Sequence, residues 1–265
     1  MKDRVSIDLK DGVADVRLIR ADKMNALDDA MFEGLIEAGD RLREMKGVRC
    51  VVLSGEGKAF CAGLDMASFA AMKEKGDQVT RDLTGRTHGI ANRPQQCAWQ
   101  WRTLPVPVIA AVHGVAFGGG FQIMLGADMR YATADARFSV MEIKWGLVPD
   151  LAGTQLMRHL VREDVVRELT YTGRIFNGEE AQRLGIVTRV VADPRAAALE
   201  TAKEIAAKSP DAIRTAKRLL NDAVAVDAAT GLMAESVEQQ KLIGSPNQLE
   251  AVMSNLQKRA ATYKD

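Results

Sequence analysis

The sequence has few aromatic residues, prolines and cysteines, and almost no excess charge of either sign. Phe, Trp and Tyr make up 5% of its 265 residues, and it contains 7 prolines and 3 cysteines. Cys50, Cys61 and Cys97 show no Cys-x-x-Cys spacing, so reduced thiols are the simplest account and no metal site is expected. Free thiols of this kind favour a cytoplasmic protein.

The absence of long runs of one charge, and of long apolar runs, excludes further classes of protein. The formal net charge is +1, which supports neither a nucleic-acid surface nor membrane-surface binding. No stretch approaches the roughly 20 apolar residues of a membrane span. The start of the chain contains no apolar signal region, so secretion by that route is not expected. With 47% hydrophobic and 27% charged residues, the chain is expected to form one sizeable globular core.

The apolar pattern predicts strand and helix units first, and mostly helices after about residue 155. Residues 5–9 and 13–19 alternate apolar and polar side chains around Asp11-Gly12, which is a hairpin pattern. Compact strands are expected at 48–54, 106–112 and 186–191, and the second half of the stretch 106–154 is expected to form a strand, a turn and a short strand. Helices are expected from the cap Asp28 to about 45, and at 96–104, 121–126, 155–171, 178–184, 194–208, 210–225, 228–243 and 247–262.

This order of elements predicts an α/β core at 1–195, followed by a helical region at 196–265 for oligomer contacts. Residues 73–95 are polar and weakly periodic, and we expect a surface loop or a mobile helix there, a plausible lid over the site. Apolar side chains near 219–243 fit either a core or a contact with a neighbouring subunit. Both readings of that helical region stay open at this point.

Three consecutive glycines, Gly118, Gly119 and Gly120, lead from the strand at 106–112 into the helical segment at 121–126. Glycine lets the backbone approach a ligand closely, and the unpaired N–H groups of a helix start can hold a developing negative charge. Such a turn is also found where only tight packing is needed. Neither the G-x-G-x-x-G pattern nor the P-loop pattern fits, which favours an oxyanion over a phosphate.

Two carboxylates, Glu142 and Asp150, follow the glycines and flank a Gly-Leu-Val-Pro turn. Acids after a glycine-built anion site are typical of proton chemistry beside a stabilised oxyanion. Two structural alternatives remain open. Asp150 follows Pro149 and would suit the cap of a helix, and Glu142 would suit a surface ion pair with Lys144 or Arg137.

Five segments resemble the crotonase superfamily of enoyl-CoA hydratases and isomerases, along essentially the whole chain. They are K-M-N-A-L at 23–27, G-K-A-F-C-A-G-L-D at 57–65, H-G-V-A-F-G-G-G-F at 113–121, E-I-K-W-G-L-V-P-D-L-A-G-T at 142–154 and N-G-E-E-A-Q-R-L-G-I-V at 177–187. The resemblance implies a crotonase-like spiral of ββα units with a C-terminal helical region. It also implies a homo-oligomer, either a trimer or a dimer of trimers. No permanently bound cofactor is expected, and coenzyme A enters as part of an acyl-CoA thioester substrate.

The resemblance also implies roles for individual residues. The backbone N–H groups of Leu64 and Gly119 match the pair that holds the thioester oxygen in this family. Lys258 matches a position that reaches the CoA of a neighbouring subunit, although a solvated surface lysine fits it equally. The positions that match CoA contacts are Lys23, Met24, Ala26, Ala59, Ala62, Asp65, Gly118 and Lys258.

The acids that match the family's motif decide which reaction is favoured. Hydratases of the family use two glutamates, and this chain carries Gln122 at one of those positions and Glu142 at the other. Gln122 cannot titrate, although it can orient water or bind a substrate carbonyl. Asp150 matches an aspartate that works in dienoyl-CoA isomerases. We therefore favour an isomerase with Glu142 as proton shuttle and Asp150 as second acid or stabiliser. The alternatives are a hydratase with an altered acid pair and a non-catalytic acyl-CoA binder.

Overall fold

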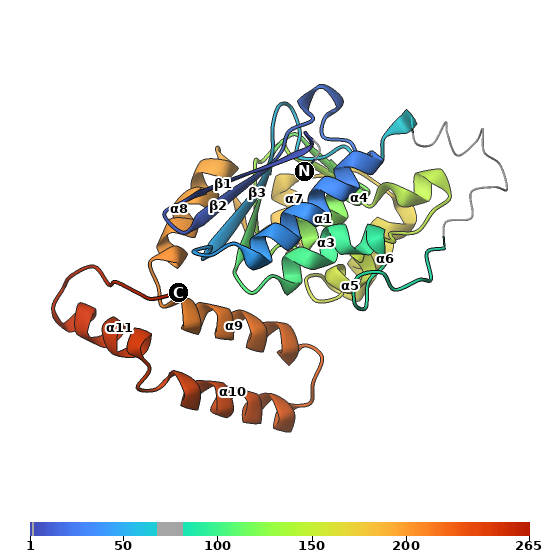
Figure 1. Ribbon diagram of the computed structural model, residues 1–265. Helices are drawn as coiled ribbons and strands as arrows, with labels where there is room; N and C mark the ends of the chain where they lie inside the picture. Colours follow the sequence, from blue (N-terminus) through green and yellow to red (C-terminus); the bar gives the residue numbers. More distant parts are fainter. Residues whose placement is uncertain (2, 68–81) are drawn as a thin grey trace.

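A computed structural model describes residues 1, 3–67 and 82–265 (Figure 1). The lid predicted at 73–95 lies partly outside these residues; of its described part, 82–95, the stretch up to Asn92 contains bends and turns, and the last three residues begin a helix at Arg93. No helix within the described ranges is long and apolar enough to cross a membrane.

The core is built on a six-stranded sheet in the order β1-β2-β3-β4-β6-β9. The first pair is the predicted hairpin, and every later neighbour in this sheet is parallel. Three shorter strands, in the order β5-β7-β8, form a second sheet. The strands are β1 (Val5–Lys10), β2 (Val13–Leu18), β3 (Cys50–Gly55), β4 (Val108–Val112), β5 (Val115–Phe117), β6 (Met129–Ala132), β7 (Arg137–Ser139), β8 (Phe176–Asn177) and β9 (Arg189–Val190).

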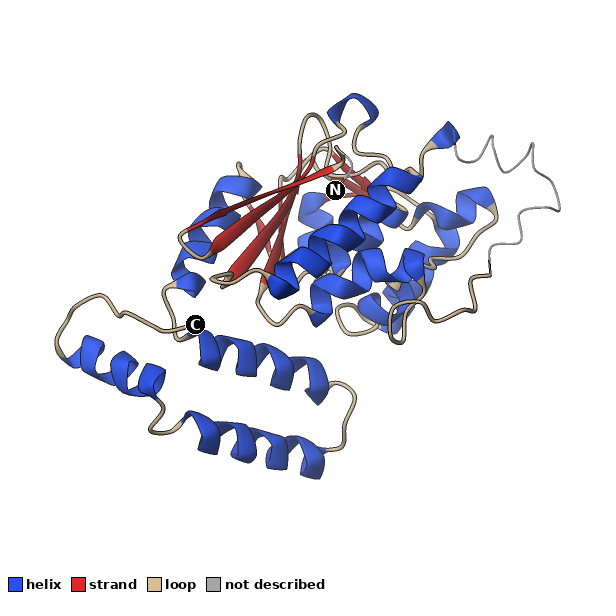
Figure 2. Ribbon diagram, in the orientation of Figure 1, coloured by secondary structure: helices blue, strands red, loops and turns tan. Residues whose placement is uncertain are grey.

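Helices cover both faces of the larger sheet (Figure 2). They are α1 (Asp29–Glu44), α3 (Arg93–Thr103), α4 (Gly119–Leu125), α5 (Gly153–Met157), α6 (Glu163–Thr172), α7 (Gly178–Arg183), α8 (Pro194–Ala206), α9 (Pro210–Ala223), α10 (Ala228–Leu242) and α11 (Pro246–Leu256), with short 3-10 helices η1 (Ala21–Lys23) and η3 (Met141–Trp145). All of β3 is buried, because alternate residues face α1 and α3 on one side and α8 on the other. This double burial explains the uninterrupted apolar run that marks the strand in the sequence.

The helix boundaries differ from the predicted ones at several points. Helix α3 begins at Arg93 rather than 96, because Asn92 and Gln95 form a reciprocal capping box that the prediction did not use. The single helix expected at 155–171 is two helices, α5 and α6, although neither glycine nor proline marks the break. Strand β9 is shorter than expected, and α11 ends at Leu256 rather than near 262.

The last three helices stand apart from the sheet. Figure 1 shows α9, α10 and α11 below the core, whereas α8 lies against the strands. Ala198, Ala202 and Ala206 of α8 pack in a core cluster with residues of the central strands. The part of the chain that stands apart therefore begins at α9. Lys217 ties α9 to the core, because its Nζ donates to Asp128 Oδ2 at 2.8 Å and to two backbone carbonyl oxygens.

Candidate active site

The glycine turn between β5 and α4 packs so closely that side chains would not fit. Gly118 has φ +50°, and a Cβ there would lie 3.1 Å from Glu142 Oε1. A Cβ on Gly119 would lie 2.7 Å from Leu27 Cδ1, and one on Gly120 would lie 2.4 Å from the backbone oxygen of Cys61. The glycines therefore allow tight packing, and Gly118 brings the backbone close to the carboxylate of Glu142, whereas their role at a ligand's oxyanion stays a prediction.

The loop that carries Leu64 contacts both Leu27 and the segment that leads into this turn. Leu27 donates its N–H to Gly63 O at 2.8 Å and accepts from Asp65 N at 3.0 Å. In this pairing the N–H of Leu64 itself points away from Leu27. The Cβ position of Gly63 lies 2.7 Å from Phe117 O and 3.9 Å from Gly119 N. The segments that hold Leu64 and Gly119 thus meet, and their joint role as an oxyanion hole stays a prediction.

Glu142, in η3, is buried beside the glycine turn, with 9% of its surface exposed. Its Oε1 accepts a hydrogen bond from Gln122 Nε2 at 2.7 Å. Its Oε2 is also buried and has no hydrogen-bond partner within the described part of the chain. Burial raises the pKa of this carboxyl above its usual value, and the nearby Asp150 charge adds to the effect. A buried carboxylate with one free oxygen and a raised pKa has the properties of a general base.

The alternative surface ion pair for Glu142 is wrong, because its two proposed partners lie on aromatic rings instead. Lys144 Nζ lies 5.3 Å from the centroid of the Trp145 ring. The guanidinium carbon of Arg137 lies 6.0 Å from the centroid of the Phe117 ring. Glu142 is instead held by the neutral amide of Gln122.

Gln122, on α4, is fully buried and connects two parts of the site. While its Nε2 donates to Glu142, its Oε1 accepts from Leu151 N at 2.8 Å and from Gly153 N at 2.9 Å. A carboxamide oxygen has two lone pairs, and here both are used. Only the second hydrogen of the amide nitrogen is therefore available for the predicted catalytic role of Gln122, which is to orient water or to bind a substrate carbonyl.

Asp150 precedes α5 but does not cap it. The N-cap of α5 is Ala152, in a left-handed conformation with φ +64° and no side-chain cap bond, so the capping alternative is wrong. The Asp150 side chain is exposed, yet surrounding protein atoms raise its pKa by removing water from the carboxylate. The charge of Asp150 also contributes to the raised pKa of Glu142, after the larger effect of burial.

Asn25 connects the two segments expected to contact CoA, although the sequence motifs did not single it out. Asn25 is fully buried, and its Nδ2 donates to Glu56 O at 3.0 Å and to Ala59 O at 2.9 Å. Its Oδ1 accepts from Arg20 N at 2.9 Å. Asn25 has a φ of +54°, a conformation that asparagine adopts more readily than most residues. The sequence offered one signal for this role, namely a polar asparagine between the apolar residues Met24 and Ala26.

Most of the residues predicted to contact CoA lie on the two segments that Asn25 connects. Lys23 ends η1 and Met24 follows in a left-handed conformation, while the backbone oxygen of Met24 accepts from Ala62 N at 2.9 Å. Asp65 forms a 2.6 Å ion pair with Arg20. A backbone N–H from Ala67 is the main cause that lowers the pKa of Asp65, with Arg20 acting in the same direction. Ala26 and Ala59 are buried, and Gly118 faces Glu142.

Lys258 lies elsewhere. It follows α11, which Figure 1 places well away from α4 and the glycine turn. A single chain therefore does not bring Lys258 to the other predicted site residues, and its contact with a neighbouring subunit's CoA stays a prediction.

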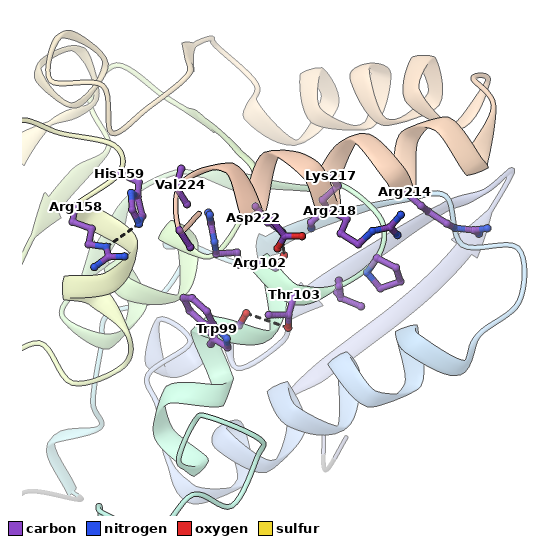
Figure 3. A pocket seen from close by; sticks show the side chains of 14 residues that line it. Trp99, Arg102, Thr103, Arg158, His159, Arg214, Lys217, Arg218, Asp222 and Val224 are labelled. Atoms are coloured by element: carbon purple, nitrogen blue, oxygen red, sulfur yellow. Dashed lines mark hydrogen bonds between the residues drawn. The ribbon is translucent and has the colours of Figure 1, made fainter. Parts of the chain in front are cut away.

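A cavity of about 580 Å³ lies between α3 and α9 and contains none of the predicted site residues (Figure 3). Its lining is rich in cations, and Figure 3 shows Arg158 donating to His159 at its rim, while Arg102 comes from α3 and Arg214 and Arg218 from α9. The amine of Lys217 is already used by Asp128 and two carbonyls. The buried carboxylate and glycine turn place the candidate active site at Glu142 instead.

Comparisons with known proteins identify the family of the chain. The Enoyl-CoA hydratase/isomerase family matches residues 8–265. The Bacillus subtilis protein YngF is 35% identical over 94% of this chain and 93% of its own length. The human mitochondrial Delta(3,5)-Delta(2,4)-dienoyl-CoA isomerase is 36% identical over 77% of this chain and 64% of its own length. The crystal structure of an enoyl-CoA hydratase from Bacillus anthracis superposes with a TM-score of 0.89 at 32% identity, covering 98% of this chain and 99% of that one. The predicted crotonase-like fold is confirmed.

Proposed function

The chain belongs to the enoyl-CoA hydratase/isomerase family of enzymes, and we propose that it moves the double bond of an enoyl- or dienoyl-CoA thioester. One observation carries the proposal: Glu142 has one oxygen held by a neutral amide, and the other is buried without a hydrogen-bond partner among the described residues. A single carboxylate of this kind is able to take a proton from one carbon and deliver it to another. Double-bond migration needs both transfers and no water.

In the proposed mechanism, Glu142 Oε2 removes a proton from the carbon next to the thioester of a 3-enoyl-CoA. The electron pair moves into the thioester, and the resulting enolate oxygen is held by the N–H groups of Leu64 and Gly119. A preorganised donor of this type is worth about 3–4 kcal/mol of transition-state stabilisation. Glu142 then returns the proton to the carbon at the far end of the former double bond, which yields a 2-enoyl-CoA and regenerates the carboxylate.

Hydration is the less favoured reaction because the second acid of the usual pair is missing. Addition of water needs one group to activate the water and another to protonate the α-carbon. Gln122 cannot titrate, and its amide oxygen is occupied by two backbone N–H groups. We therefore expect slow hydration of crotonyl-CoA.

A hydratase with an altered acid pair remains the second candidate, supported by Asp150. Its charge acts on Glu142, and both carboxyls have raised pKa values. Two coupled carboxyls with raised pKa values are able to divide the roles of acid and base between them. A pure acyl-CoA binder would need neither group.

The test is incubation of the purified protein with crotonyl-CoA, 3-hexenoyl-CoA and a 3,5-dienoyl-CoA, followed by product identification. The proposal expects 2-hexenoyl-CoA or a 2,4-dienoyl-CoA as the dominant product, and little 3-hydroxybutyryl-CoA. Rapid hydration of crotonyl-CoA with no double-bond migration would replace the isomerase by the hydratase with Asp150 as second acid.

A further inference from the structure

The side chain of Gln122 forms three hydrogen bonds inside the site. Its amide nitrogen holds one oxygen of Glu142, and its amide oxygen accepts from the two N–H groups on either side of Ala152. Ala152 has a φ of +64°, which L side chains rarely adopt. A Cβ on Gly153 would lie 2.5 Å from Gln122 Oε1, so the turn packs directly on this amide.

We propose that Gln122 is a positioning residue. It holds Oε1 of Glu142, so that Oε2 is the oxygen available for proton transfer, and it also binds the turn after Asp150. This inference rests on the proposed function, because it takes Glu142 as the proton shuttle. One amide thereby links Glu142 to the turn after Asp150, and a shift of either would require a hydrogen bond of Gln122 to break.

The neutral charge of Gln122 is part of this role. Its N–H donates to Glu142 Oε1 at 2.7 Å, which favours the ionised form of Glu142 and opposes the effect of burial on its pKa. A carboxylate at position 122 would place two oxygens against each other at this distance, and one proton would have to lie between them. The two backbone donors on the opposite oxygen favour the ionised form at 122, so that proton would reside on Glu142.

The decisive variant is Gln122→Glu, which keeps the shape of the side chain and the acceptor for both backbone N–H groups. We expect the acid limb of the kcat–pH profile to move to higher pH by about one to three units, the usual effect of a like charge in contact. The carboxyl ¹³C resonance of Glu142, assigned by its loss in Glu142→Gln, should titrate at correspondingly higher pH in the ligand-free protein. KM should change less than kcat, because the backbone that receives the thioester is retained.

Gln122→Met provides a second test that adds no charge. It removes the donor to Glu142, so the acid limb should again move up, by less than in Gln122→Glu, and kcat should fall about tenfold or more. Gln100→Met is the matched control, since Gln100 is also fully buried on a helix and donates to Leu35 O at 2.8 Å, away from the site. It should lower the melting temperature without moving the pH limb.

An acid limb and a Glu142 titration that stay unchanged in both Gln122 variants would overturn the proposal and leave Gln122 a packing residue. Failure of the proposed function has a different signature, because the wild-type protein would then show no double-bond migration. The ¹³C titration of Glu142 needs no substrate, so it still decides the effect of Gln122 in that case.

Discussion

The site around Gln122 and the three C-terminal helices make opposite use of polar and apolar side chains. At the site, polar atoms are buried and most of them are held within one chain, as in the bonds from Gln122 to Glu142, Leu151 and Gly153. In α10 no residue is buried, and Leu232 and Met233 are 63% and 65% exposed. The hydrogen bonds of Gln122 therefore need no second chain, whereas α10 carries core-like side chains without a core.

This difference predicts where a second copy of the chain would bind. Exposed apolar side chains recur along α9, α10 and α11, and a surface of that kind is usually covered by another protein surface. These residues are Leu220, Val224, Leu232, Met233, Val237, Leu249, Val252, Met253 and Leu256. We expect the chemistry to depend on the core alone and the assembly to depend on these helices, and the predictions below test that division.

The largest effect is expected from Glu142→Gln. The variant keeps the size and hydrogen bonding of the side chain but removes the base, so turnover should fall by about 10²–10⁴. Binding of a CoA ester, measured by calorimetry, should survive because the backbone of Leu64 and Gly119 is retained. Turnover that persists on every acyl-CoA tested would make Asp150 the leading candidate for the base.

The second prediction concerns the opposite region. Wild-type protein should sediment as a trimer or a dimer of trimers. The double variant Leu220→Glu, Leu232→Glu should sediment as a smaller species, because each side chain that loses apolar burial costs about 1.5–3 kcal/mol. Both residues are exposed in the single chain, so its circular dichroism should not change. A wild-type monomer at micromolar concentration would contradict the assembly and any role of Lys258 across subunits.

Asp150→Asn should have a smaller effect on activity than Glu142→Gln. If Asp150 tunes the charge at Glu142, turnover should fall about tenfold, equivalent to about 1.4 kcal/mol. The melting temperature should be retained, because Asp150 caps no helix. A loss as large as that of Glu142→Gln would instead identify Asp150 as a second catalytic acid and favour the dienoyl substrate or hydration.

The smallest effect is a dependence of stability on pH that comes from Glu142 alone. Burial raises its pKa in the folded chain above the value in the unfolded chain. Its protonated form is therefore favoured by folding, and stability is lost as pH rises from the ordinary glutamate value through the folded pKa. Glu142→Gln should melt a few degrees higher than wild type near pH 7 and show no gain below about pH 4. A gain that is equal at both pH values would rule out this cause.

Much of the fold could be predicted from local patterns. The hairpin of β1 and β2, the buried strands β3 and β4, and the helix capped by Asp28 all follow from periodicity and capping chemistry. The boundaries that failed depended on contacts between distant residues. The break between α5 and α6 has no local signal, and β9 ends where its pairing with β6 ends.

The sequence by itself determined the family, the glycine turn and the identity of the acids, because these depend on residue types at set spacings. Only the tertiary structure decided which partner each side chain has. It placed Glu142 against Gln122 rather than Lys144, removed Asp150 from the helix cap, and buried Asn25 between two segments. The physical reason is that hydrogen bonds and desolvation depend on atoms brought together across 20 or more positions of the chain, as between Gln122 and Glu142. A local sequence pattern does not show which distant residues the fold brings together.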